Sequence, residues 1–262
     1  MFRYFISAIF ILCFLRGYSQ NKPIDLQPKD TAVYKQPYGL RVGIDLSRPV
    51  RSFFDDNYTG LEIVGDYRLT QKMYLAAELG NEERTREEEL EGTLENSGNI
   101  GLYNYTTSGS YLKVGIDFNT YENWYGMNNS IHVGGRYAFS SFSQTLNSFN
   151  FYDSNRFFSA DGFVEGSTSP EEFNGLNASW LEFVFGTKVE LYKNIYLGAS
   201  VRVGLLITEK ESDRFPNLWI PGFNKVTDDS SFGVGYNYSI TYLIPLYKKA
   251  KKPKKVETNP EE

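Results

Sequence analysis

A single histidine is the first residue in this chain to consider for chemistry. His132 is the only histidine among 262 residues, and Ser130 and Ser200 fall near it in the sheet that the sequence predicts. A histidine beside a serine or a water molecule can act as the base that activates it for attack on a lipid or peptide bond. The competing interpretation is an interior histidine that is bonded to a carboxylate. The choice depends on where the fold places His132.

Metal-binding chemistry has little support. With one histidine, and with the only cysteine, Cys13, inside an apolar N-terminal segment, a zinc site is not expected. The run Glu82–Glu95 holds seven glutamates and could hold calcium loosely. It lacks the Asp, Asn and Gly spacing of a defined calcium loop, so a solvated acidic loop is the simpler interpretation. We predict no metal, no cofactor and no catalytic residue.

The last strand, Ser231 to Tyr247, shows the pattern on which the fold prediction rests. Its even positions are all apolar or aromatic up to Leu246, whereas its odd positions are small or polar up to Thr241. Successive side chains on a strand point to opposite faces, so this segment has one apolar and one polar face. It exceeds the usual length of about 5–6 residues, whereas about 9–11 residues suffice to cross a membrane. The pattern therefore predicts a membrane-crossing strand.

Seven further segments alternate in the same way. With the last strand they give eight: 40–47, 58–69, 73–80, 112–119, 131–140, 181–191, 195–207 and 231–247. No apolar run reaches the length of about 18 residues that a membrane-spanning helix requires, whereas a barrel exposes only alternate residues to lipid. We therefore predict an all-β fold, an eight-stranded antiparallel up-and-down transmembrane β-barrel with long outer loops.

The connections between the predicted strands alternate in length. Short turns near Gln71, Trp124 and Lys193 fall at one end, which we assign to the periplasm together with both termini. The longer connections fall at the other end and are expected to be outer loops: 49–57, 82–109, 146–177 and 209–230. Within them, residues 99–107 recover some strand character and are interpreted as a hairpin extension beyond the membrane. Short periplasmic turns and longer outer loops are typical of outer-membrane barrels.

The polar faces of the strands carry a nearly neutral set of charges. Seven acidic and six basic residues lie there: Asp45, Glu62, Asp66, Glu78, Asp117, Glu182, Glu190, Arg41, Arg68, Lys113, Arg136, Lys188 and Arg202. Because burying unpaired charge is costly, a closed interior must match its signs. Eight strands enclose a space that is just wide enough to be filled by side chains. We expect a filled, ion-paired interior and no open pore.

A soluble eight-stranded barrel with its apolar face inside is the alternative fold. Its outer face would be crowded with Lys, Glu and Thr, whereas the remaining polar-face residues here are largely Gly, Ala and Ser. The apolar face also ends in aromatic residues near the periplasmic edge: Tyr67, Tyr121, Trp124, Tyr125 and Tyr242. Membrane interfaces favour Tyr and Trp because one end of the side chain is apolar and the other is wet. The membrane interpretation is therefore preferred.

The N-terminus is typical of an export signal. Arg3 supplies the positive charge, Tyr4 to Leu15 the apolar core, and small residues before Gln20 suit a signal peptidase. The predicted organisation is a signal peptide (1–19), a disordered periplasmic leader (20–37), the barrel (38–247) and a disordered lysine-rich periplasmic tail (248–262). Cleavage removes Cys13, so no disulfide is expected. Acylation of Cys13, the lipoprotein alternative, is disfavoured because no small residue precedes it.

These features resemble a known class of protein. The export signal ending in Gly17-Tyr18-Ser19-Gln20, the eight alternating strands and the aromatic last strand resemble small outer-membrane β-barrels of the OmpA-like superfamily. More narrowly, the chain resembles an uncharacterised Bacteroidota family of unknown function. The resemblance covers about residues 38–247. It implies the outer membrane of a Gram-negative bacterium and insertion by the barrel-assembly machinery. The lysine-rich tail after Tyr247 departs from the usual aromatic ending.

The predicted function is a non-enzymatic outer-membrane barrel with a structural or surface-interaction role. Aromatic residues of the outer loops would grip a surface partner or cap the barrel mouth, and both uses stay open: Phe149, Phe151, Tyr152, Phe157, Phe158, Phe163, Trp219 and Phe223. The expected partners are outer-membrane lipid, the barrel-assembly machinery and a surface ligand at loops 82–109, 146–177 and 209–230. A net charge of −5 and the exported location argue against nucleic acid, and we expect a monomer.

Two other functions stay as alternatives. One is a lipid- or peptide-acting barrel enzyme that uses His132. It is disfavoured because known lipid-modifying barrels work mainly from the outer leaflet, whereas His132 is expected near the periplasmic edge. Unchanged envelope lipids after replacement of His132 by alanine would remove this alternative. The other is a narrow channel or small-ligand carrier, which ion conductance in planar bilayers would support.

Overall fold

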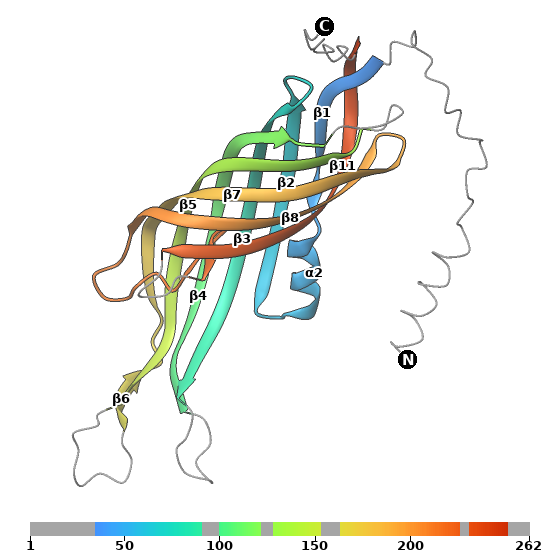
Figure 1. Ribbon diagram of the computed structural model, residues 1–262. Coiled ribbons are helices and arrows are strands. Elements are labelled where there is room, and N and C mark those ends of the chain that lie inside the picture. Colours follow the sequence, from blue (N-terminus) through green and yellow to red (C-terminus); the bar gives the residue numbers. More distant parts are fainter. Residues whose placement is uncertain (1–34, 91–99, 122–127, 153–162, 226–230, 251–262) are drawn as a thin grey trace, which may run out of the picture. The chain divides into compact units, whose positions relative to one another are not determined.

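The computed structural model describes residues 35–90, 100–121, 128–152, 163–225 and 231–250 (Figure 1). The predicted signal peptide with Cys13, most of the predicted leader and the tail after residue 250 lie outside the described residues, as do Trp124 and Tyr125. In the described ranges, no helix is both long and apolar enough to cross a membrane.

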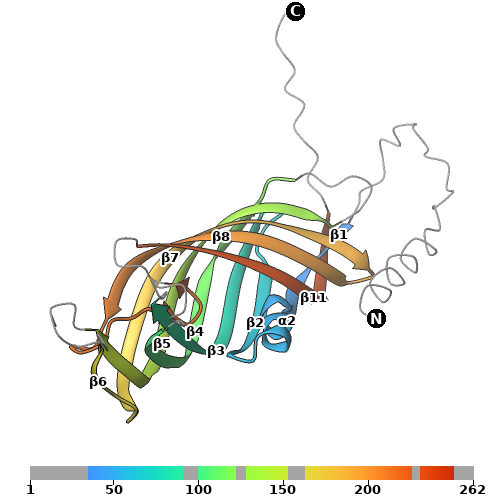
Figure 2. The same cartoon turned by 90° about the horizontal axis from the view of Figure 1, so that it is seen from below.

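The described chain forms an antiparallel β-sheet that closes on itself (Figures 1 and 2). Its elements are β1 (Lys35–Asp45), α2 (Ser47–Phe54), β2 (Tyr58–Arg68), β3 (Met73–Leu90), β4 (Ile100–Asn119), β5 (Ser130–Tyr152), β6 (Phe163–Ser167), β7 (Glu171–Tyr192), β8 (Ile195–Lys210), β9 (Trp219–Ile220), β10 (Asn224–Lys225) and β11 (Phe232–Ala250). Hydrogen bonds join eight strands of this nine-stranded sheet into a ring, in the order β1-β2-β3-β4-β5-β7-β8-β11 and back to β1. The predicted count of eight antiparallel strands is confirmed for the ring.

The alternation of side chains decides which face of the sheet points into the ring. On β2, every second residue from Tyr58 to Arg68 is buried, and the outward residues Leu61 and Ile63 are exposed. The same alternation holds around the ring. The charged side chains lie inside, together with some apolar and aromatic ones such as Val184 and Trp180, and most of the large apolar side chains lie outside. This orientation, which is the reverse of an ordinary soluble sheet, agrees with the prediction.

The short turns and the chain ends of the ring share one end, called here the terminal end. The register pairs Lys35 with Ala250, so the sheet begins three residues before the predicted start of the barrel at 38 and ends three residues after its predicted end at 247. β2 and β3 are joined by a tight turn in which the Thr70 hydroxyl accepts the Met73 amide (3.0 Å). β7 and β8 are joined through Asn194, whose φ of 68° lies in the left-handed region that Asn tolerates. The turns predicted near Gln71 and Lys193 are therefore confirmed.

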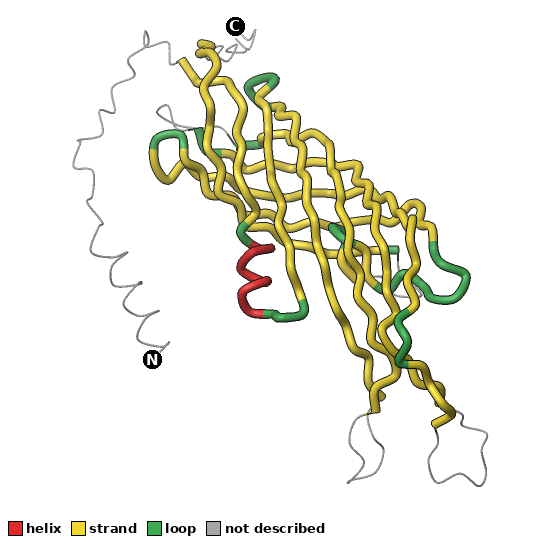
Figure 3. Tube along the Cα trace, turned by 180° about the vertical axis from the view of Figure 1, so that it is seen from behind, coloured by secondary structure: helices red, strands yellow, loops and turns green. Residues whose placement is uncertain are grey.

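At the opposite end, called here the loop end, two of the predicted loops are largely strand (Figure 3). β3 continues through the acidic run to Leu90, and β4 begins at Ile100, so much of 82–109 is strand. β5 continues to Tyr152 and β7 begins at Glu171, so much of 146–177 is strand as well. The charged run was interpreted as a loop because loops and solvated strands both carry polar residues. The strand here has polar residues on its outer face and keeps its ladder of hydrogen bonds. The strand expected over 99–107 is confirmed for 100–107, and residue 99 lies outside the described residues.

The predicted connection 49–57 also needs correction, because it begins inside the helix α2. Pro49 lies in the first turn of this helix, where its missing amide proton costs no hydrogen bond. The helix ends at Asp55, whose amide donates to the Arg51 carbonyl (2.9 Å). A short helix flanked by two alternating strands leaves little periodicity in the sequence, which explains why it was not predicted.

The connection 209–230 contains a buried portion, residues 211–223, which we call the capping segment. Phe215, Trp219, Ile220 and Phe223 are all buried in it. Trp219 packs with Tyr58, Tyr105 and Leu146, whereas Ile220 and Phe223 pack with Trp180 and Tyr111. Trp219 and Phe223 therefore cover the interior of the ring. For these two residues, burial favours a cap over contact with a surface partner.

Candidate functional site

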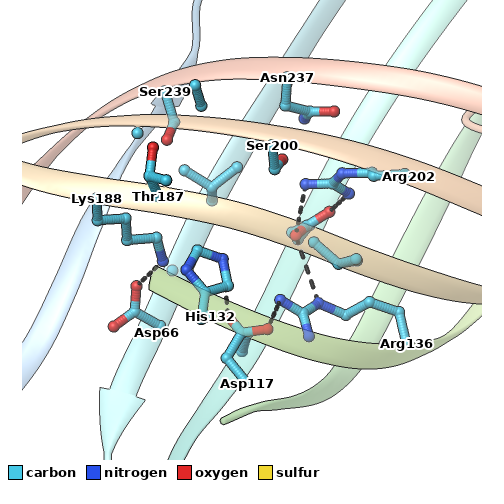
Figure 4. A pocket seen from close by; sticks show the side chains of 17 residues that line it. Asp66, Asp117, His132, Arg136, Thr187, Lys188, Ser200, Arg202, Asn237 and Ser239 are labelled. Carbon is cyan, nitrogen blue, oxygen red and sulfur yellow. Dashed lines mark hydrogen bonds and ion pairs between the residues drawn. The ribbon is translucent and has the colours of Figure 1, made fainter. Parts of the chain in front are cut away.

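The interior of the ring is held together by ion pairs that cross it. Asp66 on β2 accepts a hydrogen bond from Arg41 on β1 (Nε to Oδ1, 2.7 Å) and another from Lys188 on β7 (Nζ to Oδ2, 2.5 Å). β2 and β7 are not neighbours in the ring, so the Lys188–Asp66 pair spans the interior. Figure 4 shows this pair beside His132.

A second group of pairs centres on Glu78 of β3. Arg202 on β8 binds both carboxylate oxygens of Glu78 in the two-pronged arrangement that suits a guanidinium. Arg136 on β5 lies between Glu78 (Nε to Oε1, 3.6 Å) and Asp117 on β4 (Nη2 to Oδ1, 2.7 Å). Four strands from both sides of the ring are joined in this way (Figure 4).

A third group surrounds Glu182 of β7. Lys113 on β4 donates to Glu182 Oε1 (2.7 Å), and so does the indole nitrogen of Trp180 (2.7 Å). Arg202 reaches the other oxygen of Glu182 at 3.4 Å and thereby connects this group to Glu78. The second and third groups are therefore one network.

The buried charges balance, as predicted. Seven carboxylates are buried in the described residues, and six Lys or Arg residues are buried with the half-buried Lys188 as a seventh cation. Glu190 of the predicted interior set is half-buried at the terminal end of β7, where its carboxylate accepts the Asn194 amide (3.1 Å). Since a buried unpaired charge is strongly destabilising, this balance is a condition for a closed interior.

A small polar cavity of about 40 Å³ remains between these pairs (Figure 4). His132, Lys188, Arg136 and Ser200 are among the residues that line it. A site of this size with polar walls has room for a few water molecules, because one water needs about 10–15 Å³ of such space. The interior is therefore filled, in agreement with the prediction.

His132 forms part of the wall of this cavity. It is buried, and its Nε2 atom lies 3.9 Å from Asp117 Oδ2. Ser200 lines the same cavity, but no hydrogen bond joins His132 to a serine within the described ranges. A base must be within hydrogen-bond reach of its nucleophile, so the geometry favours the carboxylate-facing interpretation of His132.

At the loop end, the interior is closed by α2 and the capping segment. Both are attached to Glu82, which is fully buried. Glu82 accepts hydrogen bonds from the hydroxyl of Tyr58 (3.0 Å) and from the amide of Gly222 (3.0 Å), and it pairs with Arg48 Nε at 2.8 Å. Lys113 donates to the Gly222 carbonyl (2.9 Å). One carboxylate therefore joins β2, α2 and the capping segment.

At the terminal end, Arg68 performs the corresponding closure. Its guanidinium donates to Gln36 (2.7 Å), to Asn128 (3.2 Å) and to the carbonyl of Gln71 (3.1 Å), and it lies 4.4 Å from the ring centroid of Tyr38. These groups come from β1, from the turn after β2 and from the segment before β5. Both ends of the interior are thus covered by side chains.

Sequence reasoning missed two members of the network, Glu82 and Arg48. Glu82 keeps the inward parity of Glu78 and Gly80 on β3, so extending the strand by one more pair would have found it. Arg48 had no such signal, because only the reversal of the chain into α2 turns it inward. Its ion pairs with Asp45 and Glu62 are both 3.6 Å long.

Across the described part of the chain, no group of three or more His, Cys, Asp or Glu residues is arranged to hold a metal ion. The carboxylates of the interior are instead taken up by Arg and Lys. The chemistry that this arrangement performs is charge pairing, which fixes eight strands around a filled interior.

A closed ring of antiparallel strands with buried ion pairs inside is the class of structure that the fold and the interior define. Over residues 1–249, the sequence matches the family described as a domain of unknown function, DUF6048, and the chain belongs to that family. No curated protein and no solved structure matches the chain significantly.

Proposed function

We propose that this protein is an integral β-barrel of the outer membrane, non-enzymatic and closed to ions, with a structural or surface-interaction role at its loop end. The observation that carries the proposal is a continuous apolar band on the outside of the ring. Monomeric soluble proteins rarely expose contiguous apolar patches of more than a few hundred Å². Here most outward residues within the band are large and apolar on every one of the eight ring strands, and a bilayer is the environment that such a surface requires.

The apolar band has a sharp edge toward the loop end. Its last outward residues are Ile44, Leu61, Leu79, Leu112, Phe139, Leu181, Ile207 and Phe232. The next outward positions on five of the strands are exposed and polar: Thr59, Asn81, Ser110, Ser141 and Glu209. Where β3, β4 and β5 run side by side, three apolar residues face one another in register and are followed by Asn81, Ser110 and Ser141 in register. Such a straight boundary is expected where hydrocarbon meets water.

The height of the band also suits a bilayer. On β5 it runs from Ile131 to Phe139, about 27 Å along a strand that rises about 3.3 Å per residue. With the tilt of about 40° that is usual for barrel strands, this corresponds to about 20 Å, close to the apolar band of about 25 Å in outer-membrane barrels. Tyr121 and Tyr242 are exposed toward the terminal end, as expected for an interface.

The role beyond the membrane would belong to the strand extensions at the loop end. The outer face of β3, β4 and β5 there is polar and internally bonded, for example by Thr85 to Thr106 (2.8 Å) and Asn147 to Asn104 (2.7 Å). The inner face is covered by the capping segment. A rigid, polar, outward-projecting sheet supports a surface interaction, whereas the filled interior argues against conduction and the isolated His132 against catalysis.

The decisive experiment compares arginine substitutions inside and outside the band. Ile116→Arg places a charge on the outward face of β4 within the band, and Ser141→Arg places one just beyond it. Because an arginine near the bilayer midplane costs about 2–4 kcal/mol, we expect that loss in the free energy of unfolding in phospholipid vesicles for Ile116→Arg. Ser141→Arg should change it by about 0.5 kcal/mol or less. Equal effects, or a wild-type protein that stays monomeric in buffer without detergent, would refute the proposal.

A further inference from the structure

The wall of the ring is incomplete next to β1, which is too short. β1 leaves the sheet after Asp45, whose register partner on β11 is Ser239. On its other side, its last pair with β2 is Ile44 with Ile63. β11 continues to Phe232 and β2 to Tyr58, so β1 lies beside neither strand over these last residues. We call this gap, between 232–238 of β11 and 58–62 of β2, the seam.

Backbone groups along the seam are bonded to partners outside the strand ladder. The Leu46 amide donates to the Tyr238 carbonyl (2.6 Å), so Tyr238 directs its carbonyl toward the seam. Because backbone groups alternate along a strand, Val234 and Tyr236 direct theirs to the same side. On β2, the Gly60 amide donates to the hydroxyl of Ser52 in α2 (2.9 Å). The helix therefore replaces part of the missing strand ladder.

Helix α2 occupies the seam and is fixed by its inner face. It contacts both β2 and β11, and in Figure 2 it lies between them. Its inward residues are Arg48, which pairs with Glu82, and Arg51, whose guanidinium lies 4.3 Å from the ring centroid of Tyr58. Ser52 completes this polar face. Residues at spacings of three and four lie on one side of a helix. The contacts of Arg48, Arg51 and Ser52 therefore also determine which residues face away from the ring.

The other side of α2 is apolar and uncovered. It carries Val50, Phe53 and Phe54, again at spacings of three and four. Phe53 and Phe54 are 77% and 72% exposed, which makes Phe53 the most exposed large apolar side chain of the described chain. Their rings pack edge to face with centroids 5.3 Å apart.

The seam lies at the loop-end edge of the apolar band on β2 and within the band on β11. Leu61 on β2 is the band's last outward residue on that strand, and Phe232, Val234 and Tyr236 on β11 are outward and exposed. The apolar face of α2 is therefore continuous with the band on both sides. In hydrocarbon an open strand edge is costly, because its amides and carbonyls find no water. A helix, which satisfies most of its own backbone groups, reduces that cost.

We propose that α2 takes the place of the missing outer part of β1 as a lipid-facing segment of the wall, and that Val50, Phe53 and Phe54 contact the acyl chains of the bilayer. This inference rests on the proposed function. The aromatic pair is a membrane contact, and a protein partner for it is the competing outcome.

The test uses spin labels on single cysteines in a Cys13→Ser background of the full chain, reconstituted in phosphatidylcholine vesicles. Labels at positions 50, 53 and 54 are compared with Ile116→Cys inside the band and Ser141→Cys beyond it. Oxygen concentrates in hydrocarbon, whereas a nickel chelate stays in water. We expect oxygen, and not the chelate, to increase the spin relaxation rate of the labels on α2, as at position 116. The chelate should increase the relaxation rate of the label at position 141.

The possible outcomes distinguish the lipid contact of α2 from the membrane location of the whole ring. If labels on α2 respond to the chelate while position 116 responds to oxygen, the inference about α2 is wrong and the proposed function stands. If the α2 labels are shielded from both reagents, a protein surface covers the helix and the inference is also wrong. If position 116 responds to the chelate, the membrane proposal itself fails. Three labelled positions keep the test valid if one variant does not fold.

Discussion

Glu82 shows how one carboxylate can close an end of the ring. Its oxygens are shared by a tyrosine hydroxyl of β2, an arginine of α2 and a backbone amide of the capping segment. Tyr111 adds a weaker contact at 3.4 Å while donating to Glu62 at 2.5 Å. In a buried setting, hydrogen bonds to a charged group contribute more than those between neutral groups. We therefore expect Glu82 to matter more for stability than its sequence neighbours.

Replacement of Glu82 tests this expectation. Glu82→Ala leaves Arg48 with only its two longer ion pairs and removes the acceptor of the Gly222 amide. Removing one partner of a buried ion pair typically costs about 3–5 kcal/mol, and we expect a loss of that order in the free energy of unfolding measured with denaturant in vesicles. Glu83→Ala is the matched control, because Glu83 is exposed on the other face of β3 and should change stability by about 0.5 kcal/mol or less. A similar loss in both variants would contradict the role given to Glu82.

Residue type alone predicted most of the interior charges and missed Glu82 and Arg48. Asp66, Glu78 and Arg202 were found because each lies on the polar face of an uninterrupted strand. Glu82 was assigned to a loop because glutamates cluster after it, and a cluster of like charges usually marks a solvated segment. The pairing partners were not predictable, because register across the ring brings together residues as distant as Asp66 and Lys188.

At the scale of elements, the ring is weakest where α2 replaces a strand. Across the seam, the side chain of Asn237 on β11 donates to Glu62 (2.8 Å) and to Asp45 (3.0 Å). β1 does not lie between the two strands at the seam, so their connection there depends on side chains and on α2. Local opening is expected to begin where few backbone hydrogen bonds have to break.

Asn237→Ala tests whether the seam opens separately from the rest of the ring. The substitution leaves Asp45 and Glu62 each without one buried donor, which typically costs about 1–3 kcal/mol. We expect faster amide hydrogen exchange in residues 232–238 and 58–62, with unchanged exchange where β4 pairs with β5. Asn147→Ala is the control, because it also removes two amide hydrogen bonds but lies on the outer face of the extension. Faster exchange throughout the ring would mean that Asn237 stabilises the whole fold and not the seam.

Strands were predictable where apolar and polar residues alternate strictly along the sequence. The residues at which the strands end were not predictable. All eight ring strands were found from alternation, because apolar residues on one face and charged or small residues on the other give an unambiguous pattern. The extensions of β3 and β5 past Leu79 and Phe139 were missed because outward residues there become polar, and the alternation that marks a strand disappears although the backbone ladder continues. α2 was missed because eight residues give only two turns of periodicity.

At the scale of the molecule, the interior is closed in three layers. Arg68 closes the terminal end, the network of Glu78, Arg136 and Arg202 fills the middle, and Glu82 with the capping segment closes the loop end. The middle layer joins side chains of the ring strands without using the capping segment. It should therefore block ions even when the loop end is open.

This independence predicts the electrical behaviour of two variants. The wild type should be silent in planar bilayers, and so should a variant in which a Gly-Ser linker replaces residues 212–223, because the middle layer still fills the cross-section. Adding Glu78→Ser, Arg202→Ser and Arg68→Ser to that variant removes the middle layer and the closure of the terminal end as well. It should produce a measurable conductance, provided that heat-modifiable gel migration shows a folded ring. Conductance in the wild type would show that the ion pairs do not seal the interior. Conductance after removal of the capping segment alone would place the seal at the loop end instead of the middle.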